Sequence, residues 1–196
     1  MNIQKFFDEM NISDMEKVLR IQASTVISER IYTLLQNYSD GHMPDSEFLN
    51  ALADCLLTAD NLSGQYDTTE ENIRIISEIA KSVVDTTKNG KSDYAYSMER
   101  AQAIAVNEVN RASNAYSHEM AKKMGYSMHK WVSHGDKTTR SSHRQANGQW
   151  HPIDIPFQIG QYKMLFPMDT SYGAPIDEII NCRCVETFFA RDTHSV

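Results

Sequence analysis

Side chains that could do chemistry concentrate in two stretches of the second half of the chain. The first, residues 131–144, reads WVSHGDKTTRSSHR, and the second, residues 181–184, reads NCRC. Zinc is commonly held by cysteine and histidine, and the chain offers four such ligands here: His134, His143, Cys182 and Cys184. The Cys-x-Cys spacing argues against zinc, because structural sites usually separate paired cysteines by about two to four residues. We therefore expect no metal and no other cofactor.

A thiol beside an imidazole could also be a catalytic nucleophile. His143 could activate Cys182, and Asp136 could orient that histidine. Nothing in the spacing brings the three side chains within hydrogen-bond reach of one another. We therefore predict no catalytic residue and no enzymatic activity.

A structural role for these polar residues is the interpretation we favour. Asp136, Arg140 and Arg183 could form charge-assisted hydrogen bonds that tie the loop at 134–145 to the turn at 181–184. The Asn181 amide could fold that turn. We expect a fold-locking motif whose surface is used for binding, formed by Trp131, Asp136, Arg140, His143, Arg144, Asn181, Cys182, Arg183 and Cys184.

The elements before this motif are predicted to be helices. Apolar residues recur at helical spacing up to about Tyr38, namely Met15, Val18, Leu19, Val26, Leu34 and Leu35. A second stripe contains Phe48, Leu49, Leu52, Ala53, Leu56 and Leu57, and a third helix opens at Thr68–Thr69 and ends at Asn89–Gly90. A longer helix is expected from Tyr96 to Met124, with Gly125 as its left-handed cap.

After Gly125 the pattern changes to short strands. Residues 127–133, 162–166 and 184–189 are strand candidates, and Asn147-Gly148 is a turn signal. The sequence thus predicts an α+β protein: a helical region at 1–90, then a small α+β module at 91–196 with a long leading helix. The sheet of that module should be short and mostly antiparallel.

The motif residues occur in an order that resembles a known family. A Trp-containing strand, an Asp followed by Thr-Arg and Ser-His-Arg, a Gly-bearing turn, a short Pro-Asp segment and a closing Asn-Cys-Arg-Cys follow one another here. This set, over roughly residues 97–190, is similar to the C-terminal domain of the phage Mu F-like, or phage head morphogenesis, family of minor capsid proteins.

The resemblance implies a minor head protein of a tailed bacteriophage, located inside the head of the virion and assembled in the host cytoplasm. It implies binding to the portal protein, with the major capsid or scaffold protein and packaged DNA as further candidate partners, during head assembly or DNA ejection. An ADP-ribosyltransferase-like toxin or another enzyme module of phage origin is the alternative, although only twelve residues follow Cys184.

Charge restricts where DNA could bind. Residues 1–90 carry 7 basic and 15 acidic residues, a net charge of −8, whereas residues 91–196 carry 12 and 11, a net charge of +1. Only the second half could approach phosphates without a large penalty. Candidate contacts for non-specific DNA are Lys122, Lys123, Lys130 and Lys137. No apolar run is long enough to cross a membrane, so no membrane partner is expected.

Overall fold

The computed structural model describes residues 1–63, 70–90 and 92–190. The chain forms two compact units. The helical unit contains Met1–Asp8 and Asp14–Ala112, and the sheet unit contains Glu9–Ser13 and the chain from Ser113 onward. Short antiparallel sheets beside predominant helix confirm the α+β class predicted from sequence.

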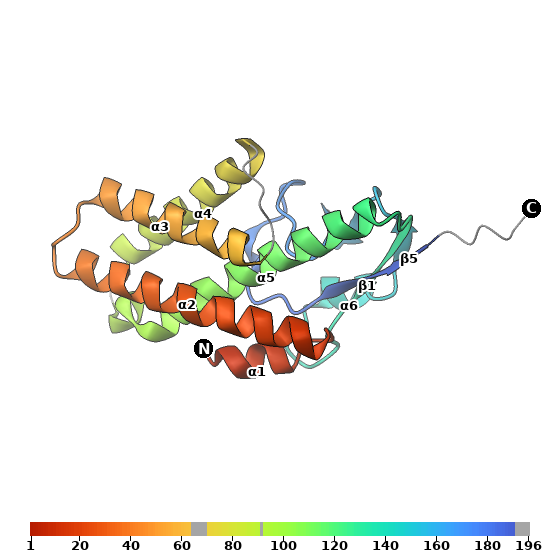
Figure 1. The fold of residues 1–196 in the computed structure, drawn as a ribbon, viewed down its shortest axis with the longest axis horizontal. Helices are drawn as coiled ribbons and strands as arrows, with labels where there is room; N and C mark the ends of the chain where they lie inside the picture. The colour runs from red at the N-terminus through yellow and green to blue at the C-terminus, as the bar shows by residue number, and fades with distance from the viewer. Residues whose placement is uncertain (64–69, 91, 191–196) are drawn as a thin grey trace, which may run out of the picture. The chain divides into compact units, whose positions relative to one another are not determined.

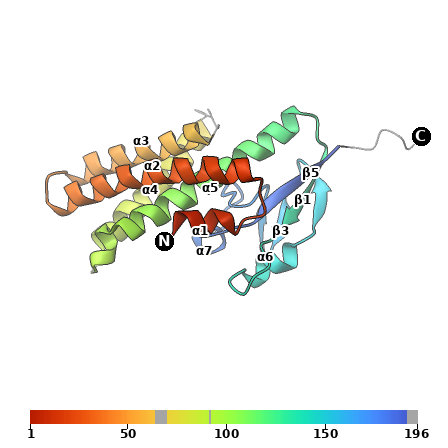
Figure 2. The ribbon, with the colours of Figure 1, turned by 60° about the horizontal axis from the view of Figure 1, so that its bottom comes forward.

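The helical unit is built from long helices joined by short connections (Figures 1 and 2). Helices α2 and α3 lie side by side and antiparallel, and α3 in turn contacts α4. The bounds are α1 (Ile3–Asp8), α2 (Asp14–Ser39), α3 (Asp45–Leu62), α4 (Glu70–Lys88), the 3₁₀ helix η1 (Asp93–Tyr96) and the first part of α5 (Met98–Lys123). Our predicted start of the third helix at Thr68–Thr69 lies outside the described residues.

The end of α4 depends on a glycine. A Cβ at Gly90 would lie 2.6 Å from the Cβ of Ala95, closer than real Cβ atoms approach. Only glycine therefore allows the chain to turn from α4 into η1. The predicted end of this helix at Asn89–Gly90 is confirmed within two residues.

The buried face of α2 differs from the stripe we expected. The helix is present, but Met15, Val18, Leu19 and Val26 are 48–70% exposed. The residues that α2 buries instead are Arg20, Ala23, Ser24, Ile27, Ser28, Ile31 and Leu35. Two of the polar residues on this face have partners: Arg20 donates to the Asn110 amide oxygen, and the Ser28 hydroxyl donates to Thr25 O (2.9 Å).

A buried charge network joins α3, α4 and α5. The Arg111 guanidinium donates to Asp60 Oδ1 (2.9 Å) and to Glu108 Oε1 (2.5 Å), and the Asn72 amide donates to Asp60 Oδ2 (2.7 Å). All four side chains are buried. One guanidinium thus faces two carboxylates in a site that water does not reach, where an unpaired charge is costly.

Helix α5 belongs to both units. Its residues up to Ala112 lie in the helical unit, and those from Ser113 lie in the sheet unit. The compact units divide inside this helix, where Asn110 and Arg111 bind side chains of α2 and α3. The predicted cap at Gly125 is confirmed: its φ is +84°, and Tyr126 N–H donates to Ala121 O (3.0 Å).

The sheet unit contains two small antiparallel sheets. In the first, β1 (Met128–Val132) lies between β2 (Trp150–Pro152) and β5 (Val185–Phe189), and Trp131 pairs with Glu186. The second is a hairpin of β3 (Phe157–Ile159) and β4 (Tyr162–Met164). Short helices α6 (Ser141–Ala146) and α7 (Ile176–Ile179) complete the unit. The three predicted strands are confirmed, whereas part of the predicted loop at 134–145 is helix α6.

The core of the sheet unit surrounds Trp131. This side chain is fully buried and makes an edge-on ring contact with Phe157 at 5.3 Å. The core also contains Ala146, Ile159, Met164, Met168, Ile179, Cys182 and Cys184. The two cysteines are therefore packed as part of the hydrophobic core. Among the described residues, no helix is both long enough and apolar enough to pass through a bilayer.

Candidate functional site

Asp136 organises the loop between β1 and α6. Its Oδ1 accepts hydrogen bonds from the backbone N–H groups of Thr138 (3.0 Å) and Thr139 (2.9 Å) and from both threonine hydroxyls (2.9 and 3.0 Å). An aspartate that accepts bonds from the next residues is typical of a tight turn. This loop conformation therefore needs the carboxylate in its charged form.

Arg183 connects that loop to the turn before β5. Its Nη2 donates to Asp136 Oδ2 (2.6 Å) and to the Thr138 hydroxyl (2.6 Å), and its Nη1 bonds Glu9. Burial would raise the pKa of Asp136, but hydrogen bonds from Arg183, Thr138 and Thr139 hold that pKa well below its usual range. One guanidinium thus ties together three segments of the sheet unit.

The other motif residues lie around this contact. Arg140 Nη2 donates to Ile180 O (2.5 Å), a second bond between the two segments, and Arg144 Nη1 donates to Asp136 O (3.3 Å). Asn181 has a φ of +56°, in the left-handed region that asparagine tolerates better than most residues. Its backbone conformation therefore contributes to the turn.

A buried histidine and two cysteines form the inner part of the motif. His143 Nδ1 lies 3.3 Å from Cys184 Sγ and 3.5 Å from Cys182 Sγ. On the other side of the ring, Nε2 lies 3.1 Å from Glu178 Oε2, at ion-pair distance but outside hydrogen-bond geometry. The ligand atoms of His143, Cys182 and Cys184 all lie within 4.8 Å of one another, so this group could hold a soft metal ion.

The two cysteines are electrostatically different. A hydrogen bond from the Cys184 thiol, followed by the His143 contact, lowers the pKa of Cys182 against the effect of burial. The bond to Cys182, burial and the neighbouring charge raise the pKa of Cys184. Burial would lower the pKa of His143, but its bond to Cys182 raises that pKa overall. The arrangement therefore favours a thiolate on Cys182 facing an imidazolium on His143.

The geometry does not support two of the alternatives considered for this cluster. Asp136 does not orient His143, because its carboxylate is used by Arg183 and the loop threonines, and Glu178 lies beside the imidazole instead. His134 is not a fourth ligand, because it faces Asp136 with Nε2 3.7 Å from Oδ2. Both cysteines and His143 are at most 2% exposed, so a substrate could not reach the thiolate in this conformation. The geometry supports a packed, polar lock better than a nucleophile.

Two acidic partners of the motif were not predicted from the sequence. Glu178 is on α7, and Glu9 lies in the short segment 9–13 that joins the sheet unit. Glu9 is 174 residues away from Arg183 along the chain. No local sequence signal predicts a contact over that separation, because only the fold decides which surface acid reaches an arginine.

The candidate DNA-contacting lysines are distributed over several elements. Lys122 and Lys123 are in the last turn of α5, Lys130 is in β1, and Lys137 is in the loop before α6. All four are exposed, but Lys122 Nζ pairs with Asp154 Oδ1 (2.8 Å). A DNA contact by these side chains stays a prediction.

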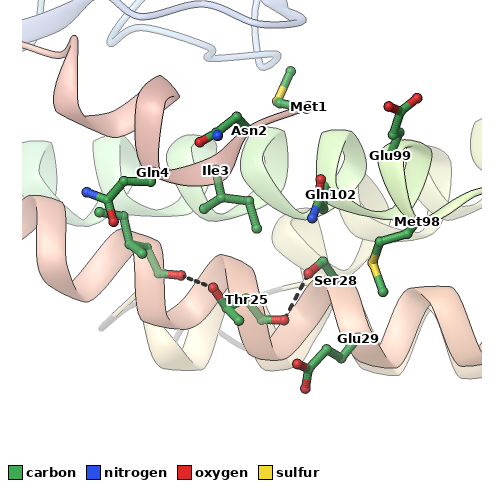
Figure 3. A pocket seen from close by; sticks show the side chains of 11 residues that line it. Met1, Asn2, Ile3, Gln4, Thr25, Ser28, Glu29, Met98, Glu99 and Gln102 are labelled. Carbon is green, nitrogen blue, oxygen red and sulfur yellow. Dashed lines mark hydrogen bonds between the residues drawn. The ribbon is translucent and has the colours of Figure 1, made fainter.

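The helical unit contains an open pocket of about 750 Å³ (Figure 3). It is lined by the first four residues and by side chains of α2 and α5, including Thr25, Ser28 and Gln102. The Thr25 and Ser28 hydroxyls donate to carbonyl groups of their own helix, as the dashed lines show. Two carboxylates, Glu29 of α2 and Glu99 of α5, also line the pocket and lie apart from each other (Figure 3).

Replacing Arg183 with methionine tests the lock. We expect Arg183→Met to lose about 1.5–3 kcal/mol of unfolding free energy at pH 7, because Asp136 and Glu9 lose a charged donor. The folded pKa of Asp136 lies below its unfolded value, so its stabilisation is present above about pH 4 and is lost on acidification. Denaturant unfolding at pH 7 and pH 3 should show a smaller difference between the proteins at pH 3.

Arg144→Met is the matched control for this substitution. Arg144 is exposed and makes one long bond, to a backbone carbonyl at 3.3 Å. Its loss should change the unfolding free energy by no more than about 0.5 kcal/mol. Equal stability of Arg183→Met and the unmodified protein at pH 7 would show that the motif does not lock the fold.

Comparison with known proteins gives one match. A family model described as phage Mu protein F like protein matches residues 71–187. These residues include nearly all of α4, the whole of α5, the strands from β1 to the first part of β5, and every residue of the motif from Trp131 to Cys184. No curated protein and no solved structure matches the chain.

Proposed function

Because the chain belongs to the phage Mu protein F like family, we propose that it is a minor head protein that docks onto the portal from inside the phage head. In this proposal the sheet unit is the rigid module with the locked motif, and the helical unit carries the docking surface. The major capsid or scaffold protein is a secondary candidate for the same surface.

The exposed face of α2 is the observation that carries the docking proposal. Met15, Leu19 and Val26 fall within about 40° of one another around a helix that advances 100° per residue, and Val18 is adjacent. Each is about half exposed or more. An apolar stripe of this kind on a surface helix is the feature that inserts into a hydrophobic groove of a helical partner.

Charge favours a protein over nucleic acid at this face. The first 90 residues carry a net charge of −8, which repels phosphates and attracts a basic protein surface. The partner groove should therefore be apolar at its centre and rimmed by lysine or arginine.

Co-expression with the portal protein encoded in the same phage genome tests the proposal. Size-exclusion chromatography with mass detection should show co-elution at a defined stoichiometry. We expect Leu19→Glu with Val26→Glu to weaken that association at least about tenfold, because two charges would be buried in an apolar groove.

Ile73→Glu provides the matched control on α4. Ile73 is 48% exposed, as Val26 is, so its replacement introduces one negative charge, half of the change in the double variant, at an equally exposed apolar position. Portal binding should survive this change. Absence of co-elution with the unmodified, folded chain, or equal weakening by both variants, would contradict docking through α2.

A further inference from the structure

A second buried polar cluster lies in the sheet unit, outside the motif. His118 from α5, His129 from β1 and Glu186 from β5 converge on one point. Glu186 Oε1 lies 2.6 Å from His129 Nδ1 and 3.1 Å from His118 Nδ1. Both histidine side chains are fully buried and the glutamate side chain is 3% exposed. Three ionisable side chains are therefore enclosed together without contact with water.

The hydrogen bond on the far side of His129 determines what faces Glu186. His129 Nε2 lies 2.9 Å from Ile155 O, and a carbonyl oxygen only accepts, so Nε2 carries the hydrogen. In the neutral ring, Nδ1 then directs a lone pair at a carboxylate oxygen 2.6 Å away. Two acceptors at that distance repel each other unless a cation, a proton or a metal ion, lies between them.

A single proton leaves the cluster incompletely satisfied. Glu186 Oε2 is buried and has no hydrogen-bond partner, and the same holds for His118 Nε2. Leaving such an acceptor bare in a dry site is costly. A metal ion bound by both carboxylate oxygens and by the two Nδ1 atoms would use Oε2 as well as Oε1, giving four ligand atoms from three residues.

The surroundings favour tight binding of an ion. The ring centroid of Phe157 lies 4.1 Å from that of His129, and the ring centroid of Phe166 lies 5.5 Å from that of His118. Apolar rings therefore surround the two histidines. The charged pair Asp154–Lys122 interacts electrostatically with both histidines. A backbone carbonyl that holds the outer nitrogen of a ligating histidine, as Ile155 O does, is the usual support for such a ligand.

We propose that His118, His129 and Glu186 bind one divalent transition-metal ion, with Zn²⁺ as the best match to two imidazoles and a carboxylate. Zinc–ligand distances of about 2.0–2.2 Å place ligand atoms of different residues roughly 3.3 Å apart when the site is close to tetrahedral. The 3.1 Å distance between Glu186 Oε1 and His118 Nδ1 is close to this value. The 2.6 Å distance between Glu186 Oε1 and His129 Nδ1 would increase by a fraction of an ångström when the ion binds. The ion joins the end of α5 to β1 and β5.

Metal titration of the full chain tests the site. The chain is first treated with chelator, then titrated with Zn²⁺ and dialysed. We expect elemental analysis to find one tightly bound Zn²⁺ per chain. Glu186→Gln, which keeps the shape and removes the charge, should weaken Zn²⁺ binding at least about 100-fold, since loss of an outer partner alone costs about 10–100-fold. His151→Gln is the matched control, because His151 is outside both candidate clusters, and it should bind as the unmodified chain does.

Cobalt substitution separates this site from the cysteine cluster. Co²⁺ at His118, His129 and Glu186 should give visible d–d bands without thiolate-to-metal charge transfer in the near ultraviolet. A double Cys182→Ser, Cys184→Ser variant should keep its metal. Thiolate charge transfer with loss of metal in the double variant would place the ion at His143 and overturn the proposal. Failure of the unmodified, folded chain to bind Zn²⁺ or Co²⁺ would overturn it as well, whatever the variants do.

Discussion

Arg111→Met should destabilise the helical unit by about 3–5 kcal/mol, because removing one partner of a buried ion pair leaves uncompensated charge. Arg111 is the guanidinium between Asp60 and Glu108, and all three side chains are buried. Methionine retains much of the apolar volume, so the loss should reflect charge more than packing. Denaturant unfolding followed by the helical circular dichroism signal measures the effect.

The size of this loss should depend on pH. Burial, opposed by Arg111 and assisted by Glu108, raises the pKa of Asp60 to about 7. A folded pKa above the unfolded value near 4 contributes stability that is complete below about pH 4 and is lost as pH rises through 7. Without Arg111 the pKa of Asp60 should rise further. The deficit of Arg111→Met should therefore be larger at pH 8 than at pH 5.

Arg74→Met is the control for a charge pair that water can screen. Arg74 and Glu78 form an i,i+4 pair on α4 with both side chains more than half exposed. Breaking it should cost less than about 1 kcal/mol at any pH between 5 and 8. If Arg74→Met and Arg111→Met lose the same stability, the buried network does not hold the three helices together.

Trp131→Ala should cost the sheet unit about 3–5 kcal/mol, the usual range for removing a large aromatic side chain from a core. Trp131 is a fully buried residue of β1, with ring contacts to Phe157 and His143 at centroid distances of 5.3 and 5.5 Å. The cavity would remove packing from the cysteines as well. Trp131→Phe should recover part of the loss, because it refills part of the volume.

Trp150 supplies an internal comparison for this prediction. It is 57% exposed in β2, so Trp150→Ala should change stability by no more than about 1 kcal/mol. In a Trp150→Phe background, the fluorescence of Trp131 should be blue-shifted when folded and should shift red on unfolding. A red-shifted folded spectrum, or equal losses for the two alanine variants, would refute the placement of Trp131 in the core.

Local signals in the sequence predicted most of the secondary structure. Gly125 as a left-handed cap predicted the end of α5, and the strand signal at residues 127–133 predicted β1. These signals act over a few residues, so they can be read without the fold. Buried and exposed side chains alternate along β1, so His129 lies on the buried face together with Trp131. This pattern was not used to predict a site at His129.

The sequence predicted the contact between the two motif segments better than it predicted the partners of individual side chains. Charged residues in the 134–145 and 181–184 segments suggested a lock, and Arg183 lies against Asp136. The partner of His143 could not be chosen from sequence, because Glu178, Asp136 and His134 all lie within a plausible range. The fold places Glu178 beside the imidazole and turns His134 toward Asp136.

The sequence by itself determined the α+β class, the positions of the principal helices and strands, and the ordered residues of the phage Mu F-like motif, because helix periodicity, strand alternation and turn residues are local properties. Only the tertiary structure decided that α2 buries Arg20 and exposes Leu19, that Arg111 joins two carboxylates, and that His118, His129 and Glu186 meet. Each of these outcomes depends on partners far apart in the chain, and a polar side chain can be buried only where the fold brings such a partner to it.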